Sequence, residues 1–309
     1  MHYELRTLHS PLSTLNSLLC GTAAHIGSNF MIKNQLIADS HTHSNNSFDA
    51  ENSVAEMLER ANEIGLDYLT ITDHFEAAFY FEPDEEFGDL KKLLPQSVSD
   101  TRQQQSITSG KTELLCGIEL GEPLHDIKAT NEVLSLTDYD FVLCSMHNLR
   151  DMGDFFWLDY KSEDIPELLK KYFIELTECV QWGNFDSLAH ITYPMRYICD
   201  KSRISVDLSD YKNEIDTLLA LLAEKGKALE FNTCRNDALS LETVGSCRDV
   251  QFLKRFRDLG GKYVTLGSDA HKTADLAKGI DGAIDILRDI GYGEITVFKN
   301  RQPHLLPIK

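Results

Sequence analysis

Short apolar segments alternate with amphipathic helical segments from residue 36 onward, and this alternation limits the possible folds more than any other feature. The apolar runs are brief and bounded by polar residues or glycine, as buried parallel strands are. The predicted strands are residues 36–39, 68–72, 113–120, 140–145, 186–189, 228–232 and 263–267. Seven such repeats without a linker predict one α/β domain, a distorted seven-stranded (β/α)7 barrel that resembles a TIM barrel.

Capping residues mark several of the intervening helices. Ser53 and Glu56 form a predicted capping box, and Gly65 fits the end of that helix. Pro166 lies near the first turn of another helix, where proline is favoured. Two further helices are predicted at residues 210–225 and 248–259, each followed by a glycine.

The first residues differ from the rest of the chain. Residues 7–32 carry no charged side chain apart from histidines and are rich in Ser, Thr, Asn and Gly. Polar residues interrupt the apolar run, so a secretory signal is not favoured. We therefore predict a poorly ordered extension at residues 1–34 and a folded domain at residues 35–309.

Charge and cysteine usage narrow the functional classes. The formal net charge of −19 disfavours nucleic acids and anionic membranes as partners. The seven cysteines are widely spaced and include no C-x-x-C pair, which disfavours a disulfide framework or a thiolate zinc site. Free thiols are expected in a reducing compartment, which predicts a cytoplasmic protein.

Polar residues of metal-ligand type follow most of the predicted strands. They are His41 and His43, Asp73 and His74, Glu119, His147, His190, and Asp269 and His271. Each one alone has a simpler interpretation: His41-x-His43 could lie on an exposed loop, and His147 could be a hydrogen-bonded core residue. However, the carboxyl ends of parallel barrel strands share one face. Ligand-type residues at six strand ends therefore predict a shared metal centre.

The residue types at this face restrict the metal. Imidazoles with a few carboxylates and no thiolate favour Zn²⁺, Mn²⁺ or Fe²⁺ over Ca²⁺. Eight or nine ligands exceed what one tetrahedral ion can use, so two to three divalent ions are expected. Glu119 is the best candidate for a bridging ligand, because a carboxylate has two oxygens.

The motifs resemble the PHP superfamily, the polymerase and histidinol phosphatase domain, over residues 36–309. The resemblance rests on residues 39–44, 70–74 and 267–271 in combination. It implies three metals. His41, His43, Glu119 and Asp269 would bind the first, Glu119, His147 and His190 the second, and Asp49, His74 and His271 the third. Asp49 could instead cap the helix that follows Ser53.

Weaker matches resemble the stand-alone histidinol-phosphatases. They are residues 190–197, residues 228–235 and the tail at residues 297–303. Cys234 and Arg235 depart from the small residues usual there, which puts Arg235 in doubt as a phosphate ligand. The implied activity is hydrolysis of L-histidinol phosphate, a small phosphorylated metabolite of histidine biosynthesis.

A metal-bridging hydroxide would then attack phosphorus, and metals would neutralise the phosphate oxygens. Glu119, Asp269 and His271 are the expected catalytic residues. Arg196, Arg235 and Lys272 are candidates to bind phosphate, although Arg196 could simply form a surface ion pair. Asp39 and Asp73 could orient the histidines. The acidic segment at residues 151–159 could bind the substrate amine.

Three alternatives stay open at this point. Another esterase of the same superfamily could act on nucleotides or phosphotyrosine. A metal-dependent amidohydrolase also begins with H-x-H on a barrel, but it would usually have a lysine after the fourth strand, where this chain has His147. A non-catalytic metal-binding protein would keep the ligands without turnover. The oligomeric state stays unknown.

Overall fold

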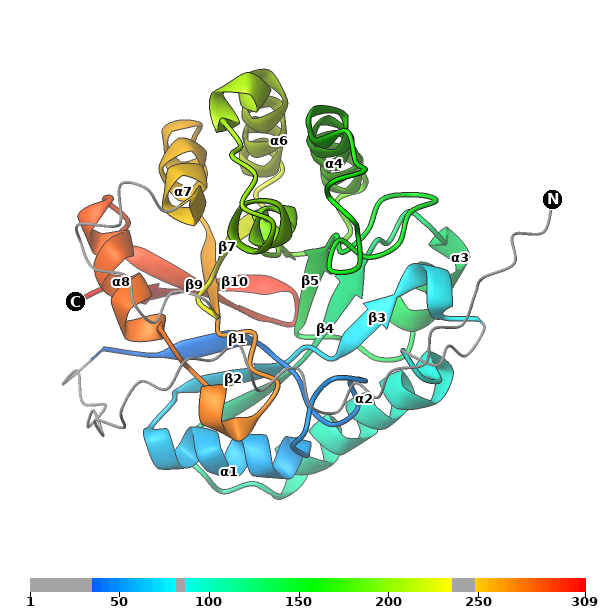
Figure 1. The fold of residues 1–309 in the computed structure, drawn as a ribbon. Coiled ribbons are helices and arrows are strands. Elements are labelled where there is room, and N and C mark those ends of the chain that lie inside the picture. Colours follow the sequence, from blue (N-terminus) through cyan, green and yellow to red (C-terminus); the bar gives the residue numbers. More distant parts are fainter. Residues whose placement is uncertain (1–34, 82–86, 235–247) are drawn as a thin grey trace. The chain divides into compact units, whose positions relative to one another are not determined.

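A computed structural model describes residues 35–81, 87–234 and 248–309, and these form a sheet surrounded by helices (Figure 1). The strands are β1 Ala38–Thr42, β2 Tyr68–Ile71, β3 His74–Glu76, β4 Glu113–Gly121, β5 Phe141–Ser145, β6 Ser187–Leu188, β7 Ala228–Asn232, β8 Val264–Gly267, β9 Glu294–Lys299 and β10 Gln302–Pro307. The α-helices are α1 Val54–Ile64, α2 Leu90–Ile107, α3 Ile127–Leu134, α4 Ile165–Trp182, α5 Tyr193–Met195, α6 Lys212–Glu224, α7 Arg248–Asp258 and α8 Ile280–Asp289. A π-helix, η2 Arg196–Lys201, follows α5, and 3₁₀ turns lie at η1 Ala77–Phe79, η3 Leu208–Tyr211 and η5 Thr273–Asp275.

The parallel strands form a nearly closed barrel. Their order is β1-β2-β4-β5-β6-β7-β8, and β3 pairs with β4 beside this path. The ends of the path meet beyond β8, where the amide of Asp269 donates to the carbonyl of His41 at 2.8 Å. The amide of His43 likewise donates to the carbonyl of Ala270 at 2.9 Å. The predicted distorted barrel of seven parallel strands is confirmed.

Local chemistry sets the ends of α1. The hydroxyl of Ser53 accepts a hydrogen bond from the amide of Glu56, whose carboxylate accepts one from the amide of Ser53 at 2.8 Å. Gly65 ends the helix with φ 77°, a left-handed conformation that glycine adopts without steric cost. The predicted capping box and helix stop are both confirmed. Asp164 similarly caps α4, with Pro166 in its first turn.

The hairpin β9–β10 is attached to the amino-terminal end of the barrel. The amide of Arg301 donates to the carbonyl of Asp140 at 2.9 Å, and its guanidinium donates to Asp186 at 2.7 Å. Asp140 and Asp186 immediately precede β5 and β6. Phe298 is buried and stacks on Phe141 with 5.5 Å between ring centroids. The hairpin thus covers the end opposite the predicted metal centre.

Several elements were not predicted from the sequence. They include β3, the hairpin β9–β10 and the π-helix η2. The seven predicted barrel strands are all present, with ends displaced by up to three residues. The predicted extension at residues 1–34 and the candidate phosphate ligand Arg235 lie outside the described residues, so these two predictions are not addressed by the structure.

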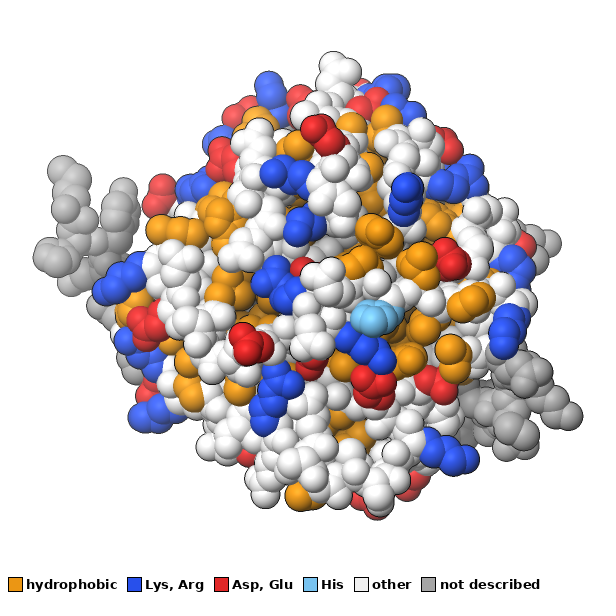
Figure 2. Space-filling view, turned by 180° about the vertical axis from the view of Figure 1, so that it is seen from behind, with side chains coloured by type: hydrophobic (Ala, Val, Ile, Leu, Met, Phe, Trp, Pro, Cys, Tyr) orange, Lys and Arg blue, Asp and Glu red, His pale blue; other side chains and the backbone are white. Residues whose placement is uncertain are grey.

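The described residues also bear on the expectations for membrane spans, cysteines and surface charge. No helix among them is both long and apolar enough to cross a membrane. Cys116, Cys144 and Cys179 are buried free thiols. Lysine and arginine side chains are interspersed with acidic ones on the face shown in Figure 2, so the negative net charge forms no continuous patch there.

Replacing the ring of Phe298 with alanine tests the contribution of the hairpin. We expect the Phe298→Ala variant to lose about 3–5 kcal/mol of unfolding free energy, because the ring is removed from a packed core. Leu305→Ala on the neighbouring strand is the matched control, since Leu305 is 44% exposed. Denaturant unfolding measures both. Equal losses in the two variants would contradict the assigned role.

Candidate metal centre

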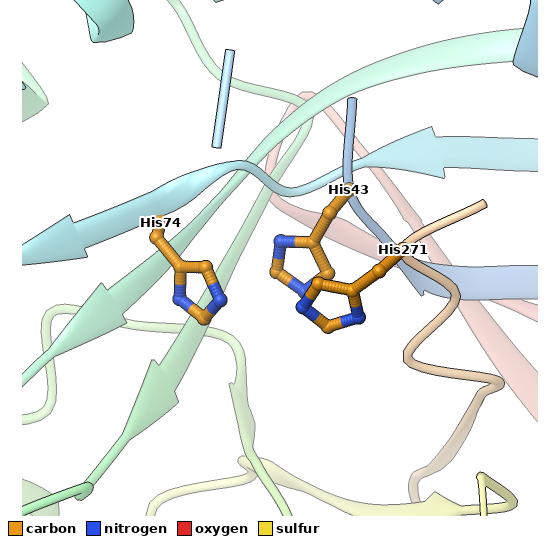
Figure 3. A group of neighbouring side chains, drawn as sticks. All are labelled: His43, His74 and His271. Atoms are coloured by element: carbon orange, nitrogen blue, oxygen red, sulfur yellow. The ribbon is translucent and has the colours of Figure 1, made fainter. Parts of the chain in front are cut away.

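The expected ligands come together at the carboxyl ends of the barrel strands. His41 lies in β1 next to its last residue, Glu119 lies near the end of β4, and Asp269 follows β8. The other expected ligands are His43 after β1, Asp49 in the next loop, His74 at the start of β3, His147 after β5, His190 after β6 and His271 after β8. Figure 3 shows three of these histidines, from separate segments, grouped together.

Glu119 lies at the middle of the cluster. Its Oε1 is 2.9 Å from His190 Nε2 and 3.3 Å from His147 Nε2, and its Oε2 is 2.8 Å from His74 Nδ1, 3.5 Å from His41 Nε2 and 3.7 Å from His43 Nε2. The carboxylate is buried. One carboxylate within reach of five imidazoles has the geometry needed to bridge two cations.

Asp269 provides a second point of convergence. Its Oδ1 lies 3.5 Å from His41 Nε2 and 3.4 Å from His43 Nε2. The two histidine nitrogens are themselves 3.1 Å apart. Together with Glu119 Oε2, these atoms could hold one ion.

Asp49 approaches two histidines on the more exposed side of the cluster. Its carboxylate lies 3.0 Å from His271 Nε2 and 3.7 Å from His74 Nε2. The ring of His43 stacks on both His74 and His271, with centroid separations of 4.3 Å (Figure 3). The side chain of Asp49 is 34% exposed and that of His271 is 30% exposed, so this part of the cluster faces solvent.

The donor set fits divalent cations. His74 Nδ1 and Glu119 Oε2 lie 2.8 Å apart, and His271 Nε2 lies 3.0 Å from Asp49, but these buried atoms lack the alignment of a hydrogen bond in the described structure. Buried polar atoms are nearly always hydrogen-bonded, so such atoms gathered in one place indicate ligands for another group. Overlapping triads of the cluster have ligand atoms within 4.8 Å of one another. Imidazole and carboxylate donors are those that zinc, manganese and iron accept.

Two carboxylates that the sequence analysis did not single out orient the histidines. Glu230 Oε1 lies 2.6 Å from His41 Nδ1, and Glu76 Oε1 lies 3.1 Å from His147 Nδ1. In each ring the other nitrogen therefore faces Glu119. Such partners fix the tautomer and the orientation of metal-binding histidines. The alternation in β7 could have indicated Glu230, because it shares one strand face with Asn232.

Two glycines leave space for the carboxylates that contact His41 and His147, and a third buried acid contacts the backbone of His147. A Cβ on Gly267 would lie 2.4 Å from His41 Cβ and 2.5 Å from Glu230 Oε1, so a side chain there would displace the pair. A Cβ on Gly121 would lie 2.6 Å from Glu76 Oε2. Glu122, also buried, accepts a hydrogen bond from the amide of His147. The close packing of the strands thus depends on glycine where the ligand partners lie.

Asp39 and Asp73, which were expected to orient the histidines, do not contact an imidazole ring directly in the described structure. Asp39 accepts hydrogen bonds from the amides of Ser268 and Ala277, at 2.9 Å each, and so holds the loop after β8 rather than an imidazole. Asp73 accepts from the hydroxyl of Ser47 at 2.9 Å, and Ser47 Oγ lies 3.2 Å from His43 Nδ1. Asp73 therefore orients a histidine only through a serine.

Charges within the cluster shift the pKa values in opposite directions. Burial alone would lower the pKa of His41, but Glu230, Asp269 and Glu119 raise it well above its usual value. Burial, assisted by the neighbouring His74 and His271, lowers the pKa of His43 to about 3. Burial also lowers the pKa of His190. His43 and His190 are therefore neutral near pH 7, as a metal ligand must be.

The carboxylates respond to the same charges. Burial tends to raise the pKa of Glu119, but His74, His41 and His147 outweigh it and hold the pKa well below its usual value. The pKa of Asp49 is also lowered, because His271 and His74 outweigh the effect of burial. These acids stay ionised at neutral pH and can serve as anionic ligands.

The candidate phosphate ligands fall in different places. Arg196 begins the π-helix η2, and its Nη1 lies 3.6 Å from Asp269 Oδ2. Its side chain is only 13% exposed, so this is a nearly buried ion pair beside the cluster. π-helical turns often occur at functional sites. Lys272 is 46% exposed and pairs with Asp275 at 3.7 Å, without a contact to the cluster among the described residues.

Comparisons with known proteins agree in family and fold. The model of the PHP domain family matches residues 39–234. The chain is 28% identical to the histidinol-phosphatase of Lactococcus lactis over 264 residues, which cover 84% of this chain and 93% of that protein. It is 27% identical to a probable histidinol-phosphatase of Clostridium acetobutylicum over 245 residues, covering 76% and 87% of the two chains.

A solved structure resembles the described fold. It is the histidinol phosphate phosphatase of Lactococcus lactis in complex with Zn, L-histidinol and phosphate. The TM-score is 0.70 at 24% sequence identity, with 87% of this chain and 98% of that chain covered. At 24% sequence identity, this likeness supports a shared fold and nothing more specific.

Removing the charge of Glu119 tests its central position. We expect Glu119→Gln to lower the number of bound metal ions per chain, because an amide offers a weaker, neutral ligand at the point where five histidines meet. Glu113→Gln, on the same strand but 48% exposed, is the matched control. Elemental analysis after metal loading measures both. Unchanged metal content in Glu119→Gln would refute the bridging position.

The raised histidine pKa values predict how pH changes metal stabilisation. Burial alone would lower the pKa values of His74 and His147, yet adjacent carboxylates raise them well above the usual 6.5. In the metal-free protein these protonated rings stabilise the fold below pH 6.5, and this contribution is lost as pH rises through the raised values. Metal binding requires deprotonated rings and therefore strengthens with pH.

We accordingly expect Zn²⁺ to raise the Tm by a larger amount at about pH 8 than at about pH 6. Thermal unfolding of metal-free and metal-loaded protein at each pH measures the difference. A constant or shrinking increment with rising pH would show that proton release does not accompany binding.

Proposed function

The chain belongs to the PHP domain family, and on that premise we propose that it is a metal-dependent phosphomonoesterase that converts L-histidinol phosphate and water to L-histidinol and phosphate. The observation that carries the proposal is the approach of five histidines to the carboxylate of Glu119 at one end of the barrel. The names of the similar proteins from Lactococcus lactis and Clostridium acetobutylicum support the choice of substrate.

The proposed centre holds two to three divalent ions. His41, His43, Glu119 and Asp269 would bind one, Glu119, His147 and His190 another, and Asp49, His74 and His271 the third. The ions are Zn²⁺, Mn²⁺ or Fe²⁺, because the donors are imidazoles and carboxylates. Such ions lower the pKa of bound water towards about 7 and neutralise phosphate oxygens, which makes hydrolysis of a dianion possible at neutral pH.

The chain's own groups prepare this centre. Glu230 and Glu76 hold the Nδ1 atoms of His41 and His147, so that the opposite nitrogens face Glu119. His43 and His190 are neutral near pH 7 without any change in their surroundings. Little rearrangement of side chains is therefore needed when ions bind.

Arg196 is proposed to bind the phosphate. Its guanidinium lies beside Asp269, at the edge of the cluster, and carries a fork of donors that matches phosphate oxygens. The same oxygen, Asp269 Oδ2, also accepts a hydrogen bond from Nδ2 of Asn232 at 3.2 Å. Asp269 thus turns Oδ1 towards the histidines and Oδ2 towards Arg196 and Asn232. Lys272 could add a more distant positive charge near the exposed side.

A substrate screen tests the proposed reaction. We expect the metal-loaded protein to hydrolyse L-histidinol phosphate with a kcat/KM at least about tenfold above those for nucleotides, phosphotyrosine and sugar phosphates, which corresponds to about 1.4 kcal/mol. A preference for nucleotides or phosphotyrosine would assign another esterase activity. Amide hydrolysis without phosphatase activity would assign an amidohydrolase, and no turnover of either class would leave a metal-binding role.

Substitution of Arg196 tests phosphate binding separately. We expect Arg196→Ala to lower kcat/KM by about 100-fold with metal content unchanged, because the transition state loses charge-assisted hydrogen bonds. Arg60→Ala is the control, since Arg60 forms an exposed ion pair on α1. Steady-state kinetics decides the matter. A loss no larger than in Arg60→Ala would leave Arg196 as an ion-pair partner only.

A further inference from the structure

Aromatic side chains form one wall beside the metal centre. The ring of Tyr193, in α5, lies 4.8 Å from the ring of His147 and 5.2 Å from that of His190. Tyr197, in η2, lies 5.2 Å from Tyr193. On one side of Tyr193 the guanidinium carbon of Arg196 lies 5.5 Å from the ring centroid. This wall therefore begins at the proposed phosphate ligand and extends away from it.

Asp154 lies at the hydroxyl end of Tyr193. Its Oδ1 accepts a hydrogen bond from the Tyr193 hydroxyl at 3.2 Å and one from the amide of Phe156 at 2.7 Å. The same hydroxyl lies 3.5 Å from Oδ2 of Asp154. The ring of Tyr193 therefore lies between Asp154 and the two histidines, His147 and His190. Asp154 belongs to the loop between β5 and α4, which the sequence analysis marked as acidic.

The carboxylate of Asp154 lacks a cationic partner among the described residues. It is half-buried, and both of its hydrogen-bond donors are neutral groups. Burial raises the pKa of Asp154, because desolvation outweighs the charge of His147 and these hydrogen bonds. Removing a carboxylate from water is unfavourable unless a cation compensates its charge. Asp151 and Asp159, the other acids of this segment, are exposed, so water can solvate their charges.

We propose that Asp154 is a specificity-determining residue that binds the ammonium group of the substrate. The inference rests on the proposed function. In L-histidinol phosphate the amine is on the carbon next to the ester methylene, so it lies close to the phosphate. With phosphate at the metal centre and Arg196, the amine would lie along the Tyr193 wall, where Asp154 supplies the opposite charge. A charge-assisted contact there selects amine-bearing esters.

Two substrates that differ only in the amine test this assignment. They are L-histidinol phosphate and its desamino analogue, 3-(imidazol-4-yl)propyl phosphate. We expect the wild-type protein to prefer the amine-bearing ester by at least about tenfold in kcat/KM, and Asp154→Asn to lose about 10- to 100-fold on that ester alone, mainly through KM. On the analogue, Asp154→Asn should stay within about threefold of wild type.

Control variants separate recognition from folding. Asp159→Asn should keep the amine preference, because Asp159 is exposed and asparagine retains the bond from the amide of Lys161. Tyr193→Phe removes the hydroxyl that holds Asp154, and it should lower the amine preference even if Asp154→Asn does not fold. Tm and metal content are measured for every variant.

The outcomes distinguish this inference from the proposed function. The role of Asp154 alone would be overturned if the wild-type protein is strongly active on L-histidinol phosphate and Asp154→Asn keeps the full amine preference. If Asp154→Asn does not fold, an undiminished amine preference in Tyr193→Phe would have the same meaning. A wild-type protein that does not prefer L-histidinol phosphate over the other esters would overturn the proposed function and the inference with it.

Discussion

The close approach of one buried carboxylate to five imidazoles is the constraint on which the rest of the centre depends. Glu119 lies within 3.7 Å of histidines from four separate strand ends. Such a concentration of ionisable groups is costly in a buried place unless they are paired with each other or with ions. The parallel barrel makes the approach possible because it brings the carboxyl ends of all its strands to one face. Gly267 leaves the space in which His41 and Glu230 meet.

Much of the fold, and the approach of the expected ligands to one another, could be predicted from the sequence. The barrel strands appear as short apolar runs, and Ser53, Glu56 and Gly65 mark the ends of α1 by their capping chemistry. The expected ligands were predictable for a related reason. A histidine or acid directly after an apolar strand has a known position in a parallel barrel, so its neighbours follow from topology alone. Asp49 is in a loop, and resemblance rather than periodicity indicated it.

The features that the sequence did not predict depend on the direction of side chains and on short irregular elements. Glu230 is inside a strand, where alternation indicates the strand face of its side chain but not its contact with His41. Glu76 belongs to β3, which has three residues and gives too short a pattern to detect. The π-helix η2 depends on local hydrogen bonding that periodicity does not encode, yet it carries Arg196 and Tyr197. The different environments of Asp154 and Asp159, five residues apart, likewise come from tertiary packing.

Anomalous X-ray diffraction from crystals of the metal-loaded protein tests the central claim most directly. The account predicts two or three metal peaks, with neighbouring ions about 3.5–4 Å apart and Glu119 in contact with both members of a pair. A single ion held away from Glu119, or no ion near the strand ends, would contradict it. In that case the buried acids and imidazoles would be a structural ion-pair network, and the proposed hydrolysis would have no centre.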